Sequence, residues 1–309
     1  LAVYRPRIAL VLVIAFVARA ASALFHQYVA PLPDGVSDAN RFDLDAWGFS
    51  EDGLSGILHN YPGPNSKFYP WLMSLVYLAT GRSFLMLQSI SVFVGVLSVY
   101  AIWLLGWEVW GQRAGQAAAW IMSLFPTVVM YGALPMREVY LVLFLMFGLV
   151  WVARWAREDG MRRALWALLF FGAGIFFHGS MFIVALTFTV VVFSRLLHQW
   201  LGSIFRRRLG IVALTGIIMI GGVTSIWVTS GPNIDKLGDF KETFNAERWV
   251  QYSQQKYYAD SHLADAAYPQ WALPKNVTDL VWGIPLKTIY LLFSPFPWDI
   301  KSITHVIGL

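Results

Sequence analysis

Acidic residues are concentrated in one polar stretch near the start of the chain, GVSDANRFDLDAWGFSED at residues 35–52. Asp38 is a candidate general base, because a carboxylate held at a membrane surface can deprotonate a hydroxyl group. Arg41 lies three positions later and is suited to an anion such as a phosphate. Asp43 and Asp45 have a spacing at which two carboxylates can hold a divalent cation, Mg²⁺ or Mn²⁺, although such short patterns are common by chance. No other cofactor is expected.

A second charged pair, Arg137 and Glu138, stands in the stretch FPTVVMYGALPMREVYLVLFL. Pro135 precedes an apolar run, so the pair falls at the amino end of a predicted helix, where free N–H groups and the helix dipole favour an anion. An arginine there is suited to a phosphate. The alternative interpretation is that the two charges only mark the boundary of the membrane.

A histidine lies in a third apolar stretch, FFHGSMF, where Gly179 permits a sharp turn after His178. A lone histidine in such surroundings is more often structural than catalytic. We therefore expect His178 to support the site rather than to carry the reaction.

The amino-acid composition indicates that these residues belong to a protein embedded in lipid. Of 309 residues, 57% are hydrophobic and 13% are charged, and the mean hydropathy is +0.56, values that indicate a polytopic membrane protein. The net charge of +5 comes from basic residues clustered between apolar runs, which argues against nucleic-acid binding. The chain has no cysteine, which excludes a disulfide framework and a cysteine-ligated metal.

Seven apolar runs are long enough, or nearly long enough, to cross about 30 Å of hydrocarbon. They lie at residues 8–28, 84–106, 114–131, 138–153, 164–177, 180–195 and 209–228, and a further run begins near residue 286. The first run has no small-residue cleavage site after Phe25, so we expect it to be retained as a span. If the runs alternate in direction, the arginine-rich loops fall on one side, which predicts that this side is cytoplasmic.

The loops on the other side contain Asp38, Arg137, Glu138 and His178, which are therefore predicted to meet at one extracytoplasmic face. The apolar segment 67–81 in the first of these loops is too short to span and predicts an interfacial helix. The predicted fold is an all-α polytopic membrane protein. Its parts are a transmembrane core over 1–228 with a carboxylate-rich first outer loop over 31–83, an extracytoplasmic subdomain over 229–285, and an interfacial segment or the start of a further span over 286–309.

One charge falls within a predicted span. Arg19 lies about two thirds of the way along the first apolar run. A charged side chain at that depth is costly, so we expect it to snorkel outward or to pair with a carboxylate of an outer loop.

The order of these features resembles the membrane-embedded glycosyltransferases of the C fold (GT-C), especially the bacterial relatives of the protein mannosyltransferases and the lipid A aminoarabinose transferases. The matching stretches are SDANRFDLDA, YPWLMSLVYLATGRSFLMLQ, GQRAGQAAAWIMSLFPTVVMYGALPMRE and FFHG. The resemblance implies a GT-C-like helix bundle in the bacterial cytoplasmic membrane. It also implies a polyprenyl-phosphate sugar donor, and a lipid, glycan or protein acceptor at the extracytoplasmic face.

In that family the aspartate of the first loop acts as a base or binds the acceptor, and Asp38 matches its position. Glu138 resembles the second acidic residue, in the next outer loop. The family often places an acidic residue or a tyrosine directly after the aspartate, whereas Ala39 follows Asp38 here. The base is therefore Asp38 or, alternatively, Asp43 or Asp45.

Two other functions remain open from the sequence. The first is a polysaccharide repeat-unit polymerase or ligase that uses a glycan linked to undecaprenyl diphosphate. The second is a sugar-lipid transporter, for which more charges would be expected in the middle of the spans.

Overall fold

The computed structural model describes residues 6–32, 35–205, 218, 221, 233–234, 238–239, 245–260, 271 and 273–293. The chain divides into two compact units, Leu1–Ile226 and Trp227–Leu309, each of which is described by itself. The predicted three-part division, with its boundaries at 228 and 285, stays a prediction. The predicted span at 209–228 lies outside the described residues, apart from two isolated positions.

All the regular secondary structure described in the first unit is helical. Its helices are α1 (Pro6–Tyr28), α2 (Asp38–Glu51), α3 (Gly53–His59), α4 (Phe68–Thr80), α5 (Phe84–Trp110), α6 (Gln112–Leu124), α7 (Pro126–Ala133), α8 (Glu138–Glu158), α9 (Met161–Ile175) and α10 (Ser180–Phe205). The second unit has α13 (Ala246–Asp260), α14 (Asp279–Phe293) and a short antiparallel pair of strands, β1 (Asn233–Ile234) and β2 (Gly238–Asp239).

Four of the described helices are long and apolar enough to cross a membrane, which confirms a polytopic membrane protein. They cover Ile8–Tyr28, Phe84–Trp110, Glu138–Glu158 and Ser180–Gln199. At a rise of 1.5 Å per residue, these helices of 20 to 27 residues reach about 30–40 Å, which matches the hydrocarbon thickness. Each of them corresponds to one of the predicted apolar runs.

Two of the predicted spans differ from expectation. The run at 114–131 is not one helix, because α6 ends at Leu124 and α7 begins at Pro126. Proline has no backbone N–H and disfavours helical backbone at the residue before it, and Phe125 is extended, with φ −64° and ψ 120°. The run at 164–177 forms α9, whose 15 residues reach only about 22 Å and do not cross a bilayer by themselves.

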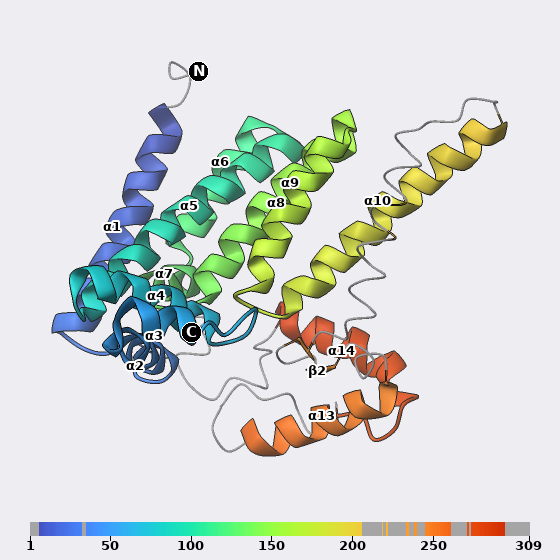
Figure 1. The fold of residues 1–309 in the computed structure, drawn as a ribbon. Helices are drawn as coiled ribbons and strands as arrows, with labels where there is room; N and C mark the ends of the chain where they lie inside the picture. Colours follow the sequence, from blue (N-terminus) through green and yellow to red (C-terminus); the bar gives the residue numbers. More distant parts are fainter. Residues whose placement is uncertain are drawn as a thin grey trace. The chain divides into compact units, whose positions relative to one another are not determined.

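Helix α5 lies at the centre of the first unit. It packs against α1, α6, α7 and α8, while α9 packs between α8 and α10. Figure 1 shows α5 and α8 running in one direction and α6 and α9 returning, so that α2, α3, α4 and the connection from α7 to α8 gather at one end of this bundle. The arginine-rich turn between α8 and α9 lies at the opposite end.

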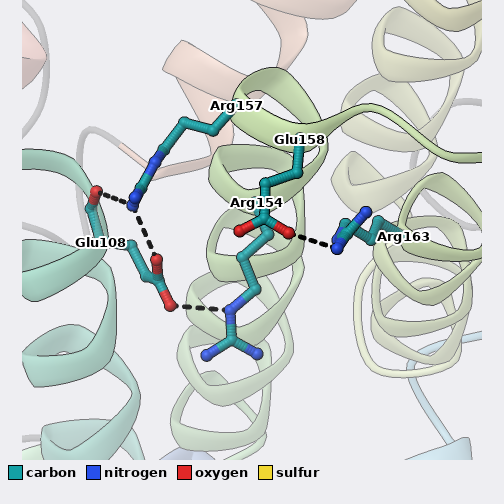
Figure 2. A network of polar contacts seen from close by, with 5 residues as sticks. All are labelled: Glu108, Arg154, Arg157, Glu158 and Arg163. Carbon is teal, nitrogen blue, oxygen red and sulfur yellow. Dashed lines mark hydrogen bonds and ion pairs between the residues drawn. The ribbon is translucent and has the colours of Figure 1, made fainter.

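Ion pairs join the helices at that opposite end (Figure 2). Glu108 on α5 accepts hydrogen bonds from Nε of Arg154 at 2.8 Å and from Nη1 of Arg157 at 3.0 Å, both on α8. Arg163 on α9 pairs with Glu158 on α8. These ion pairs are partly exposed, so we expect each to add little to stability. Their main effect is to fix how the helices align with one another.

At the acidic end, α2 is attached to the bundle by an apolar stripe. Ala39, Phe42 and Ala46 are buried at helical spacing and belong to the same core cluster as Tyr69 of α4 and Tyr140 of α8. Helix α4 covers nearly the range predicted for the interfacial helix, residues 67–81. The predicted first outer loop is thus mostly helical and packs on the bundle through α2 and α4.

Candidate active site

A cavity of about 180 Å³ opens at the acidic end of the bundle. One side is formed by Ser37 and Asp38 at the start of α2, and the other by Tyr131, Met136 and Glu138 from α7 and the start of α8. The two acidic residues that the sequence favoured, Asp38 and Glu138, therefore line the same cavity. Arg41, Arg137, His178, Asp43 and Asp45 are not among the residues that line it.

Asp38 is the first residue of α2 and is exposed to solvent. An acidic residue in a first helical turn is favoured, because the free N–H groups and the helix dipole stabilise its negative charge. The buried residues Ala39 and Phe42 fix the face of α2 that packs on the core. Arg41 is exposed one turn after Asp38, and residues three apart are neighbours on a helix surface.

Glu138 is the first residue of α8, as the sequence predicted. Its Oε1 atom accepts a hydrogen bond from Nε of Arg137 at 3.4 Å. Its Oε2 atom is buried and has no hydrogen-bond partner among the described residues. Because buried polar atoms are nearly always hydrogen-bonded, this oxygen is available to a water molecule or to a hydroxyl group of a ligand.

Arg137 is only 8% exposed. Its guanidinium group lies 5.8 Å from the centre of the Phe42 ring, a cation–π arrangement that links the start of α8 to α2. The arginine thus stands directly behind the cavity wall, between Glu138 and α2. Its contacts are with the protein groups Glu138 and Phe42.

Asp43 has two protein partners that the sequence did not predict. Tyr77 of α4 donates a hydrogen bond to Oδ1 of Asp43, and Arg82 donates to Oδ2 from Nη2 at 2.6 Å and from Nε at 3.2 Å. Gly81, with φ +76°, ends α4, and the Ser83 side chain accepts a hydrogen bond from the Met86 N–H to begin α5, so Arg82 stands at the corner between these helices. We call these three residues, Asp43, Tyr77 and Arg82, the α2 clamp.

The contacts of Asp43 do not favour the predicted metal pair of Asp43 and Asp45, which stays a prediction. Asp43 and Asp45 lie two positions apart on α2, and side chains at this spacing point to different faces of a helix. Within the described ranges, no group of three or more His, Cys, Asp or Glu residues could hold a metal ion. The contacts of Asp43 indicate a structural role rather than a role as base or metal ligand.

His178 stands in the turn between α9 and α10 and is not among the residues that line the cavity. Its Nδ1 atom accepts a hydrogen bond from the backbone N–H of Ser180 at 3.1 Å and lies 2.7 Å from the Ser180 hydroxyl. The imidazole thus satisfies a free N–H group at the start of α10, as a capping residue does. This geometry favours the structural interpretation of the histidine.

The prediction for Arg19 was wrong. The side chain does not snorkel and pairs with no carboxylate of the described residues; it is fully buried and donates hydrogen bonds to the backbone carbonyls of Ala15, Met122 and Ser123. Backbone carbonyls have no sequence pattern, so these partners of Arg19 could not be predicted from the sequence. Ser37, Tyr131 and Met136 were also missed as cavity residues, although Ser37 directly precedes Asp38.

Comparison with known proteins gives one match. The sequence profile of a family described as dolichyl-phosphate-mannose-protein mannosyltransferase matches residues 65–227, more than half of the chain. Neither the curated proteins nor the solved structures contain a match. The matched residues include Tyr131, Arg137 and Glu138 and begin after Asp38. Profile, helix bundle and membrane spans agree: the chain belongs to the dolichyl-phosphate-mannose-protein mannosyltransferase family of membrane-embedded C-fold glycosyltransferases, which use a polyprenyl-phosphate sugar donor.

Proposed function

We propose that the cavity between α2 and α8 is the place where the sugar leaves its polyprenyl phosphate and joins the acceptor, with Asp38 as general base. The observation that carries this proposal is that Asp38 and Glu138, far apart in the sequence, line one cavity at the end of the membrane-spanning bundle. Each begins a helix, so the positive ends of two helix dipoles also lie beside the cavity.

The reaction is a displacement at the anomeric carbon of the sugar. The acceptor oxygen forms a bond to this carbon, while the bond from the carbon to the phosphate oxygen breaks and leaves its electron pair on the polyprenyl phosphate. Asp38 takes the proton of the acceptor hydroxyl, which makes the oxygen a better nucleophile as the bond forms. Attack opposite the leaving phosphate inverts the anomeric configuration.

Glu138 and the two arginines support this displacement. The unpaired Oε2 atom of Glu138 is placed to accept a hydrogen bond from a hydroxyl group of the sugar or of the acceptor. Arg41, exposed beside Asp38, and Arg137, behind the wall, supply positive charge for the phosphate as it leaves. The two arginines differ in exposure, and Arg41 is the more accessible to a lipid phosphate.

The cavity volume bears on the donor. About 180 Å³ is less than the 300–1,000 Å³ of pockets that take drug-sized ligands, which supports transfer of a single sugar rather than a preassembled glycan. The family donor, a polyprenyl-phosphate sugar, also argues against the polymerase or ligase that uses undecaprenyl diphosphate. The transporter alternative does not agree with membership of a transferase family.

We also propose that the cavity faces the exterior of a bacterial cytoplasmic membrane. The end of the bundle opposite the cavity carries Arg154, Arg157 and Arg163 (Figure 2), and clustered arginines between spans are typical of cytoplasmic loops. The acceptor, whether a glycan, a lipid or a protein, would then be met outside the cell.

The test is the substitution Asp38→Asn in the purified full chain, assayed with a polyprenyl-phosphate sugar donor. Asparagine keeps the size of the side chain but cannot take a proton, so turnover should fall about 10²- to 10⁴-fold while the melting temperature changes only slightly, because only the favourable contact of the charge with the helix dipole is lost. Glu51→Gln, at the exposed other end of α2, is the matched control and should keep wild-type turnover. Wild-type turnover in Asp38→Asn would show that this residue is not the base.

A further inference from the structure

A buried arginine stands at the point where four helices of the first unit meet. Arg19 on α1 is 0% exposed, and its guanidinium nitrogens lie 3.1 Å from the Ala15 carbonyl, 3.1 Å from the Met122 carbonyl and 3.2 Å from the Ser123 carbonyl. None of the ion pairs among the described residues includes Arg19. The positive charge is therefore compensated by backbone dipoles.

The break between α6 and α7 explains why these carbonyls are available. In a continuous helix the Met122 carbonyl would accept the N–H of residue 126, but Pro126 has none. The extended backbone at Phe125 also ends the helical bonding of α6. The last carbonyls of a helix carry partial negative charge, so a cation placed there is stabilised. Arg19 thus caps α6 from the neighbouring helix α1.

Two glycines provide the space that the Arg19 side chain occupies. A Cβ atom at Gly132 of α7 would lie 2.7 Å from Nε of Arg19, and one at Gly95 of α5 would lie 2.9 Å from the same atom. Both distances are shorter than any ordinary contact between a Cβ atom and a neighbour. The side chain therefore passes between α5 and α7 before it reaches α6.

Helix α7 connects this arginine to the cavity. Gly132, which contacts Arg19, is the neighbour of Tyr131, which lines the cavity. From α7 the chain continues through Met136 to Glu138, the other two residues on this side. Gln88 of α5 holds the end of the same helix by donating a hydrogen bond to the Ala133 carbonyl at 3.0 Å.

We propose that Arg19 is a positioning residue of the transferase, which fixes α7, and with it the Tyr131–Glu138 wall of the cavity, by supplying the hydrogen-bond donors that Pro126 withholds. This inference rests on the proposed function, because the wall matters only if the transfer occurs in that cavity. Arg19 touches neither donor nor acceptor. Its effect on the reaction passes through the placement of Glu138 relative to Asp38.

The first experiment is a double-mutant cycle with Arg19→Met and Pro126→Ala. Methionine fills similar space but donates no hydrogen bond, so kcat per folded molecule should fall about 10- to 100-fold while the donor KM changes little, since misplacement of reacting groups is felt in the chemical step. Alanine at 126 restores an N–H for the Met122 carbonyl. The loss from Arg19→Met should therefore be smaller in the Pro126→Ala background.

A second pair of variants keeps the arginine and moves it. In Gly132→Ala the new methyl group meets Nε of Arg19, so the variant should lose kcat as Arg19→Met does. Gly172→Ala on α9, where an added Cβ meets nothing within 4 Å, is the control and should keep the wild-type kcat. This pair tests the inference even if Arg19→Met does not fold.

The position of the Tyr131–Glu138 wall can also be measured by spectroscopy, independently of enzyme activity. The chain has no cysteine, so Val36→Cys, just before α2, and Phe125→Cys, just before α7, both at exposed positions, can carry spin labels that report the distance between α2 and α7. We expect the distance distribution between the labels to shift or broaden in Gly132→Ala and to stay unchanged in Gly172→Ala.

The outcomes separate the two proposals. If Asp38→Asn is inactive but Arg19→Met and Gly132→Ala keep the wild-type kcat, the proposed function stands and the inference about Arg19 is wrong. The inference is also wrong if both variants lose only melting temperature, or if the loss from Arg19→Met is equal in the two Pro126 backgrounds. If Asp38→Asn is fully active, the proposed function fails first, and the spin-label distances alone then decide whether Arg19 fixes α7.

Discussion

Asp43 and Arg82, almost forty positions apart in the sequence, form a close ion pair in which the Nη2 atom of Arg82 lies 2.6 Å from Oδ2 of Asp43. The carboxylate side chain is 9% exposed and the arginine side chain is 41% exposed. A nearly buried carboxylate with a half-exposed partner fixes the position of α2, and α2 begins with Asp38. We therefore expect the α2 clamp to hold the candidate site in place rather than to take part in the reaction.

Removal of the arginine should destabilise the protein without abolishing transfer. Arg82→Met leaves the carboxylate of Asp43 with Tyr77 alone, and we expect a loss of about 1–3 kcal/mol in the free energy of unfolding. Asp43→Asn should behave similarly, and added Mn²⁺ or Mg²⁺ should not change its activity. Thermal melts and turnover per folded molecule check both variants; an inactive, stable Asp43→Asn that Mn²⁺ restores would instead identify a metal site.

The clamp also predicts a dependence of stability on alkaline pH. Burial, followed by the hydrogen bond to Asp43, raises the pKa of Tyr77 above its ordinary value of 10.0. In the unfolded chain Tyr77 loses its proton near pH 10, whereas in the folded protein it keeps it, so unfolding releases a proton and stability falls as the pH rises above 10.

The melting temperature of the wild type should consequently fall more steeply between about pH 9 and pH 11, one unit on either side of the ordinary tyrosine value, than that of Tyr77→Phe. Tyr61→Phe, at an exposed position, is the control and should keep the wild-type slope. Equal slopes for all three proteins would mean that Tyr77 does not contribute.

Arg41 and Arg137 should respond differently to substitution, because one is exposed and the other is buried. Arg41→Ala should raise the donor KM about 10-fold with an unchanged melting temperature, as expected for an accessible contact to phosphate. Arg137→Ala should lower kcat and also the melting temperature, since it removes the cation–π contact with Phe42.

Lysine should restore only part of the function at position 137, because it lacks the planar fork of arginine. Steady-state kinetics over a range of donor concentrations, together with thermal melts, separate the two arginines. If Arg41→Ala and Arg137→Ala changed KM, kcat and the melting temperature in the same way, the two arginines would not have the different roles predicted here.

His178 should prove structural. His178→Ala removes the acceptor for the Ser180 N–H, which should cost about 1 kcal/mol and lower the melting temperature while turnover per folded molecule stays intact. His178→Asn, which supplies another good capping acceptor, should recover most of the stability. A loss of turnover in both variants without a change in melting temperature would give the histidine a direct role.

The orientation of the bundle can be tested with reporters of membrane topology. A reporter inserted beside Asn60, in the connection between α3 and α4, should be extracytoplasmic, and one inserted beside Arg162, at the start of α9, should be cytoplasmic. A cytoplasmic result at Asn60 would exclude acceptors outside the cell.

Local patterns predicted the parts of the fold that depend on neighbouring residues. Hydropathy located α1, α5, α8 and α10, and Pro135 indicated that Glu138 begins a helix. The break at Pro126 was missed because apolar composition continues on both sides of the proline, so a hydropathy pattern does not change there.

Tertiary partners were not predictable in the same way. Arg82 reaches Asp43 from another helix corner, and Arg19 binds backbone carbonyls on α6, which have no sequence signature. The spacing of Asp43 and Asp45 suggested a metal pair without information on the local backbone, and on a helix such as α2 side chains two positions apart do not face each other. Asp38 and Glu138 were placed at the same end correctly because alternation of the spans is a global constraint.

The contact between Arg19 and Met122 also sets an order of assembly during synthesis. The two residues are 103 positions apart, so at 5–20 residues per second the partner carbonyls emerge from the ribosome about 5–20 s after the arginine. Throughout that interval α1 carries an unpaired charge that costs about 2.5–3.5 kcal/mol at the centre of an inserted helix. The hydrogen bonds from Arg19 to α6 therefore form only after α6 has been synthesised, many seconds after the entry of α1 into the membrane.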